Sequence, residues 1–199
     1  MKKLISLALV LVMALSMLAA CGNTNTETPD NGNNNDDAVV TGPASALEVL
    51  EKTWALFGDN EKFPVMGGDF ENAIADAPGV WNSDLLVDLS YSLQLPEAEM
   101  AKVADAATMI HMMNANTFTG AVLHLNDGED VAAFAENAKN AIMAAQWMCG
   151  FPEKLVIADL GGNYLLIAFG LNDAINPFEA KLVEAYASAN VLYSEAIAG

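Results

Sequence analysis

The sequence predicts an α+β fold, as one helix-rich domain with a central β-α-β-β unit of three strands and a C-terminal helix. Two apolar runs of strand length, 155–160 and 164–169, are joined by a turn of two glycines and an asparagine. A third such run, 118–125, precedes an amphipathic stretch that begins at Val131. The range 43–199 has the length of one ordinary domain, so these elements are expected to share one core.

The first predicted helix begins at a capping box formed by Ser45 and Glu48, and it ends at Gly58. Its apolar face comprises Leu47, Leu50, Trp54 and Phe57. Glycines and prolines then divide the range 59–82, which predicts loops and a short helix over 70–76.

The middle of the domain contains one ambiguous segment and one predicted helix. Range 83–93 fits the helical period and the strand period equally well, and Pro96 ends it in either case. Range 100–113 is rich in alanine and methionine, whose intrinsic propensities predict a helix. A strand over 118–125 and a turn over 126–128 follow.

The next helix is the clearest in the chain, and it is predicted to continue until Gly150. The 155–169 hairpin is apolar on both faces, which predicts central strands. Asn176 as cap, Pro177 in the first turn and Glu179 predict the start of the last helix. Its buried face is predicted to comprise Phe178, Leu182, Ala185, Tyr186, Ala189 and Tyr193.

The N-terminus has the pattern of an export signal. Lys2 and Lys3 precede an apolar run over 4–17, and small residues then lead to Cys21. Range 18–21 resembles the lipobox of bacterial lipoproteins, which implies a diacylglyceryl group on the Cys21 thiol and cleavage just before it. The rival interpretation is a transmembrane anchor, but about 20 apolar residues are needed to span a bilayer and the uninterrupted run is shorter.

These observations predict three parts. Range 1–20 is a signal peptide, range 21–42 is a lipidated cysteine followed by a disordered tether rich in Asn, Asp and Thr, and range 43–199 is a single globular domain. The tether would span roughly 25 Å as a flexible coil. The order of elements in the domain is similar to that of uncharacterised small lipoproteins of clostridial-type bacteria, a resemblance that implies no known activity. The expected location is the outer face of the bacterial cytoplasmic membrane, in the cell envelope.

Composition narrows the possible partners. The chain has 26 acidic residues against eight lysines and no arginine, with a formal net charge of −18. Phosphate recognition depends on arginine forks and basic patches, so nucleic acid is an unsuitable partner. The membrane, through the lipid on Cys21, and a protein or peptide at the cell surface remain as partners. No cofactor is predicted.

Candidate chemistry is sparse. Cys149 continues the apolar face of the long helix and is interpreted as a buried structural thiol, and His124 is interpreted as a core or sheet-edge residue. Glu97 with Glu99, and Glu129 with Asp130, are acidic pairs at helix starts. The candidate metal ligands, suited to monovalent copper by their thioethers and imidazole, are Met109, His111, Met112 and Met113.

The sequence therefore favours a non-enzymatic binding or accessory module held at the membrane by lipid. The alternatives are a copper-handling lipoprotein that uses the four clustered residues, a solute-binding lipoprotein, or a wall-associated hydrolase. The hydrolase hypothesis requires a cleft that brings His124 or Cys149 close to a carboxylate.

Overall fold

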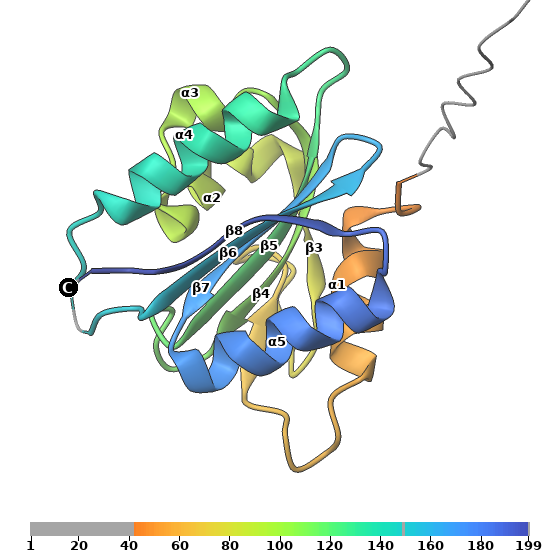
Figure 1. Ribbon diagram of the computed structural model, residues 1–199, viewed down its shortest axis with the longest axis vertical. Coiled ribbons are helices and arrows are strands. Elements are labelled where there is room, and N and C mark those ends of the chain that lie inside the picture. The colour runs from red at the N-terminus through yellow and green to blue at the C-terminus, as the bar shows by residue number, and fades with distance from the viewer. Residues whose placement is uncertain (1–41, 149, 199) are drawn as a thin grey trace, which may run out of the picture. The chain divides into compact units, whose positions relative to one another are not determined.

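An antiparallel sheet is the centre of the fold, which is shown in Figure 1 as a computed structural model whose described residues are 42–148 and 150–198. These described residues belong to one compact unit. The strands are β1 (Val65–Gly67), β2 (Ile74–Ala75), β3 (Gly79–Trp81), β4 (Val103–His111), β5 (Phe118–Leu125), β6 (Lys154–Gly161), β7 (Tyr164–Gly170) and β8 (Asn190–Ala196).

The strand order is β2-β1-β4-β5-β7-β6-β8, and every pairing is antiparallel. Strand β3 lies off this path and pairs with β4. Consequently β1 and β3 share one edge of β4, with Val65 opposite His111 and Trp81 opposite Ala106. This shared edge shapes the site described below.

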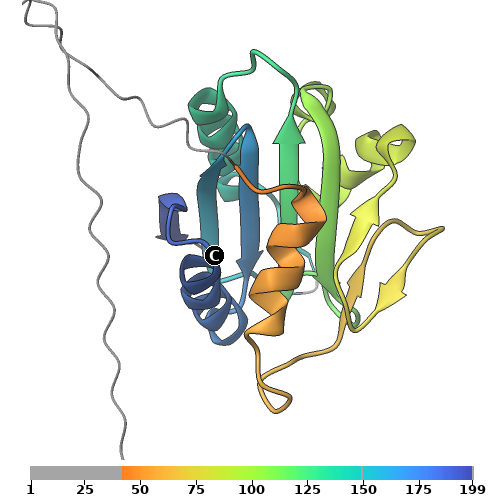
Figure 2. The same ribbon diagram turned by 90° about the vertical axis from the view of Figure 1, so that its right-hand side faces the viewer.

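Helices cover both faces of the sheet, as Figures 1 and 2 show from two directions. On one face lie α1 (Ala46–Ala55) and α5 (Asn172–Ala185), which contact each other. On the other face lie α2 (Leu86–Leu93), which follows the short 3-10 helix η1 (Ser83–Leu85), and then α3 (Glu97–Met100) and α4 (Val131–Met143). None of the helices in the described ranges combines the length and the apolar character needed to cross a membrane.

Each covered face of the sheet has its own apolar core. Beneath α1 and α5, Phe118 is fully buried between Phe63 and Phe178, with ring centroids 5.0 Å away in both cases. Beneath α2 and α4, the core includes Leu89, Phe134 and the strand side chains that point to this face of the sheet. Because both faces are covered, the central strands β5 and β7 are buried over nearly their whole length.

Several predictions from local sequence are confirmed. Ser45 caps α1 by accepting a hydrogen bond from the Glu48 backbone N–H at 3.1 Å. Strand β5, helix α4 and the β6–β7 hairpin form the expected β-α-β-β unit, and the hairpin is central in the sheet. The ambiguous range 83–93 is helical.

The predicted helix over 100–113 is wrong, because this segment is the long strand β4. Alanine and methionine favour helices by about a few tenths of a kcal/mol per residue, which tertiary pairing overrides readily. Here β4 pairs with β5 from Val103 to Ile110. Its small residues Ala106 and Ala107 are buried on opposite faces of the sheet.

Five other predictions are corrected. The domain is rich in strands rather than in helices, and range 70–76 holds β2 instead of a helix. Helix α4 ends at Met143, well before Gly150, with Ala144 as its C-cap. Helix α5 begins at Asn172 and holds Pro177 inside it. The last element is strand β8, which contains Tyr193, so α5 is not C-terminal.

Some predictions fall outside the described residues. These are the signal peptide over 1–20, the lipidated Cys21, the tether up to residue 41, and Cys149.

Candidate functional site

A largely apolar pocket of about 490 Å³ opens beside the end of β4 and is called here the methionine pocket. It is built by β1, the loop that follows it, the end of β3, helix α2 and the turn after β4. Its lining comprises Met66, Gly68, Asp69, Phe70, Ala73, Trp81, Ser92, Ile110, His111, Met112, Met113 and Ala115. Pockets of this size are typical of sites for small ligands.

Two glycines allow the strands that border the pocket to cross closely. A Cβ added at Gly67 would lie 2.2 Å from the Gly79 backbone nitrogen, so side chains are sterically excluded there. The next residue, Gly68, has φ +82°, a conformation that glycine adopts without strain. The buried Thr108 hydroxyl accepts from the Gly68 N–H at 3.1 Å and donates to its carbonyl at 3.3 Å, which ties the loop to β4.

Asp69 organises the loop from within the pocket wall. Its carboxylate accepts hydrogen bonds from the backbone N–H groups of Glu71, Asn72 and Asn82 at 2.8, 3.0 and 3.1 Å. The Asn72 side-chain amide lies 3.2 Å from both carboxylate oxygens. Burial raises the pKa of Asp69, but these hydrogen bonds outweigh it and the pKa lies below its usual value.

This depressed pKa has a defined consequence for stability. Because the folded pKa lies below the unfolded one, the ionised carboxylate stabilises the loop above the unfolded pKa, which is about 3.9. The contribution is lost only as the pH falls through the folded pKa. Asp69 is therefore a carboxylate anion throughout the neutral range.

Aromatic and thioether side chains form the mouth of the pocket. The rings of Phe70 and Trp81 meet edge to face, with centroids 5.9 Å apart and planes at 73°. Trp81 is buried and its Nε1 donates to the Leu85 carbonyl at 2.8 Å, whereas Phe70 is 82% exposed. Met112 and Met113 are also exposed, so large apolar groups surround the opening.

The structure divides the predicted metal ligands. His111, Met112 and Met113 line the methionine pocket, but Met109 is fully buried in the core beneath α1 and α5. Met66, from β1, takes its place in the pocket lining. Within the described ranges, no three His, Cys, Asp or Glu side chains are grouped so that they could hold a metal ion.

The His111 ring is already engaged. It stacks on Phe63, and its Nδ1 lies 3.3 Å from the backbone N–H groups of both Met113 and Asn114. Because Nδ1 accepts these bonds, the proton of the neutral ring is on Nε2. Neither nitrogen then offers a free lone pair to a metal.

His124 lies elsewhere, on the face of the sheet that α1 and α5 cover. Its Nδ1 is 2.8 Å from the Asp105 carboxylate, and its ring stacks on Tyr164 with centroids 4.2 Å apart. Burial, followed by the charges of Asp105 and Glu48, raises the pKa of the Tyr164 hydroxyl. A carboxylate therefore does approach His124, but neither His124 nor Asp105 lines the methionine pocket.

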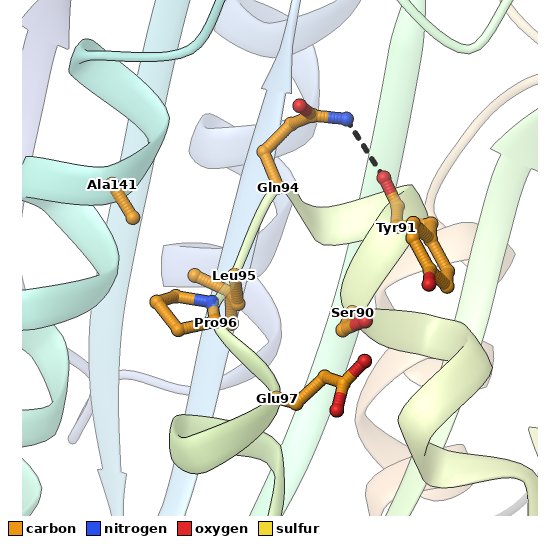
Figure 3. Close-up of a pocket in the computed structure, with 7 residues that line it drawn as sticks. All are labelled: Ser90, Tyr91, Gln94, Leu95, Pro96, Glu97 and Ala141. Carbon is orange, nitrogen blue, oxygen red and sulfur yellow. Dashed lines mark hydrogen bonds between the residues drawn. The ribbon is translucent and has the colours of Figure 1, made fainter.

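A second pocket, of about 350 Å³, lies between α2 and α4 on the helical surface (Figure 3). It is lined by Ser90, Tyr91, Gln94, Leu95, Pro96, Glu97 and Ala141. Gln94 donates its amide to the Tyr91 carbonyl at 2.7 Å and caps the end of α2 in the left-handed conformation. These polar groups complete a helix terminus, so the methionine pocket is the better candidate site.

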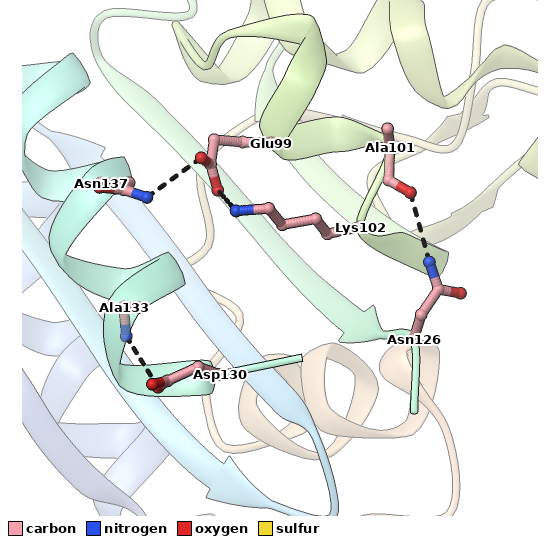
Figure 4. A network of polar contacts seen from close by, with 7 residues as sticks. All are labelled: Glu99, Ala101, Lys102, Asn126, Asp130, Ala133 and Asn137. Carbon is pink, nitrogen blue, oxygen red and sulfur yellow. Dashed lines mark hydrogen bonds and ion pairs between the residues drawn. The ribbon is translucent and has the colours of Figure 1, made fainter. Parts of the chain in front are cut away.

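Two carboxylates of the predicted acidic pairs, Glu99 and Asp130, make contacts that stabilise the fold (Figure 4). Glu99 accepts from Lys102 at 2.9 Å and from Asn137 at 3.1 Å, which joins α3 to α4. Asp130 caps α4 by accepting from the Ala133 N–H at 3.0 Å. This agrees with the prediction that these carboxylates mark helix starts.

Sequence reasoning missed Met66, Asp69, Phe70 and Trp81 as pocket residues. They lie in a range that was predicted to be loops, and the strands β1, β2 and β3 of that range are only two or three residues long. The sequence does hold a signal for this part of the pocket wall. Gly67 with Gly68, and Pro78 with Gly79, are turn-forming pairs that lie before and after Asp69 in the chain. A comparison of the chain with family models, curated proteins and solved structures finds no match in any of the three.

Proposed function

We propose that this chain is a lipid-anchored, non-enzymatic binding module of the bacterial cell envelope, and that the methionine pocket is its binding site. The observation that carries the proposal is the pocket itself, which is lined by three methionines and two aromatic rings. Methionine side chains are flexible and polarisable, and they are common at surfaces that adapt to their ligands. The lipid address rests on the lipobox pattern at 18–21.

The surroundings of the opening support a binding role. Phe70 and Met113 are each more than four-fifths exposed, which is a high value for large apolar side chains. Met148 and Phe151 are exposed as well, and the Asn116 side chain donates to the Met148 carbonyl at 2.9 Å. Exposed apolar side chains of this size are typical of binding sites.

Site-specific photo-crosslinking in the native cells tests the location of the site. With a photo-reactive residue in place of Met113, we expect a ligand or partner adduct, detected by mass spectrometry of the anchored protein. The matched control places the same residue at Val183 of α5, which is also exposed and apolar but lies on the opposite side of the sheet. Equal adducts at both positions, or none at Met113, would contradict the proposal.

Replacement of Cys21 tests the address. We expect cells fed a radiolabelled fatty acid to label the wild-type protein and to leave Cys21→Ala unlabelled. The same variant is expected to move from the membrane fraction to the soluble or precursor fraction, because stable anchoring needs two or more acyl chains. Label that persists in Cys21→Ala would refute lipidation at this residue.

Copper handling is the second candidate function, since Met66, Met112 and Met113 share one pocket. It requires that one equivalent of cuprous ion shift the methyl NMR signals of all three methionines. A Met112→Leu, Met113→Leu double variant would then lose the ion. The engaged His111 ring argues against this function, so we favour an organic ligand.

A further inference from the structure

The pocket has no positive charge of its own. In the part of the chain that the structure describes, each lysine is engaged elsewhere, by a carboxylate or over an aromatic ring: Lys52, Lys62, Lys102, Lys139, Lys154 and Lys181. None of these lysines lines the methionine pocket. An anionic ligand would therefore find no cation there to compensate its charge.

The pocket does hold a negative charge that only neutral groups stabilise. Asp69 is 2% exposed, and its hydrogen-bond partners are backbone and side-chain amides. Amide dipoles hold the carboxylate in its ionised form but leave its net charge in place. The field inside the pocket thus favours a cation and disfavours an anion.

The state of the Asp69 oxygens limits which cation is suitable. A carboxylate offers about four lone-pair sites. Four N–H donors already occupy this one, from Glu71, the backbone and side chain of Asn72, and Asn82. The carboxylate has no lone pair left for an ammonium N–H or for a metal ion. Its attraction is therefore purely electrostatic.

An aromatic ring supplies a second attraction for a cation, in addition to the charge of Asp69. The Phe70 ring is 82% exposed and presents a π face at the pocket, and its edge-to-face contact with the buried Trp81 ring holds it there. A cation within about 6 Å of such a ring is attracted by the negative face of the ring, and more strongly when the cation is desolvated. The same walls and the thioethers accept apolar substituents on that cation.

We propose that the methionine pocket binds a small quaternary ammonium compound, a cation that is covered by methyl groups and needs no hydrogen bond. This inference rests on the proposed function, because it names the ligand class of the same pocket. A primary amine is a poorer ligand, since dehydration of its three N–H groups would find no acceptor on Asp69. The lysine side chain of a peptide is disfavoured for the same reason.

The test compares isosteric probes on the full-length, detergent-solubilised protein. Choline, its neutral isostere 3,3-dimethylbutan-1-ol and its primary analogue ethanolamine are titrated while the methionine methyl NMR signals are followed. We expect choline to bind at least about tenfold more tightly than either comparator and to shift the signals of Met66, Met112 and Met113. Binding of the neutral alcohol or of ethanolamine as tight as that of choline would overturn the inference.

A pair of variants assigns the aromatic contribution. Phe70→Leu keeps an apolar side chain at an exposed position but removes one π face, and we expect choline affinity to fall several-fold. Tyr91→Leu is the matched control, because Tyr91 is also an exposed aromatic residue but lines the second pocket and not the methionine pocket. Unchanged choline affinity in Phe70→Leu would overturn the role of this ring.

The outcomes also separate this inference from the proposed function. If choline does not bind but Met113 still gives a specific adduct in cells, the pocket is a binding site and the quaternary ammonium inference is wrong. If choline does not bind and the adduct is also missing, both proposals fail.

Discussion

Replacing Phe118 with alanine is expected to lower the free energy of unfolding by about 3–5 kcal/mol. The ring is fully buried at the start of β5, where it contacts Phe63 and Phe178 across the core beneath α1 and α5. Its removal deletes two aromatic contacts and leaves a cavity that the sheet cannot collapse to fill. Since domains are stable by only about 5–15 kcal/mol, this is a large fraction of the total.

Urea denaturation followed by circular dichroism measures this effect. The control is Phe151→Ala, whose ring is 58% exposed and for which we expect a change of about 0.5 kcal/mol or less. If Phe118→Ala and Phe151→Ala lost similar stability, the assignment of Phe118 to the centre of the core would be wrong.

The second large effect is expected at the crossing of β1 and β3. A methyl group at position 67 would overlap the backbone of Ala77, Pro78 and Gly79, and no flexible side chain is available to move aside. We expect Gly67→Ala to cost about 1–3 kcal/mol and to separate the two strands, because overpacked backbone must shift. The walls of the methionine pocket then move apart, and choline affinity is lost even where the protein stays folded.

The matched control is Gly58→Ala. A Cβ at that position meets only the Glu61 carboxylate at 3.4 Å, an ordinary contact. We expect this variant to keep both its stability and its affinity for choline. Retention of choline affinity in Gly67→Ala at wild-type stability would show that the close crossing does not shape the pocket.

Elements with strong local signals could be predicted from the sequence. Helix α4 has a capping aspartate and a regular apolar face, and the β6–β7 hairpin has a glycine turn between two apolar runs. Both depend on interactions between residues close in the chain. For such elements, local preference and tertiary structure agree.

Elements that depend on distant pairing could not be predicted. Residues 103–111 favour a helix in isolation and become β4 only because β5, β1 and β3 pair with them. The strand β8 was mistaken for the end of a helix because its pairing with β6 spans more than thirty residues of chain. The pocket follows the same rule, since Met66, Trp81 and Ile110 meet only through the shared edge of β4.

The late position of β8 also bears on how the chain reaches its native state. Strand β6 is fully buried from Leu155 to Ala158, and β8 covers one of its edges. Any folding intermediate that lacks residues 190–196 therefore presents an apolar strand with unpaired N–H and C=O groups, which is a template for aggregation. The pairing of β8 with β6 joins residues more than thirty positions apart, so folding of this domain is expected to depend strongly on residues 190–196.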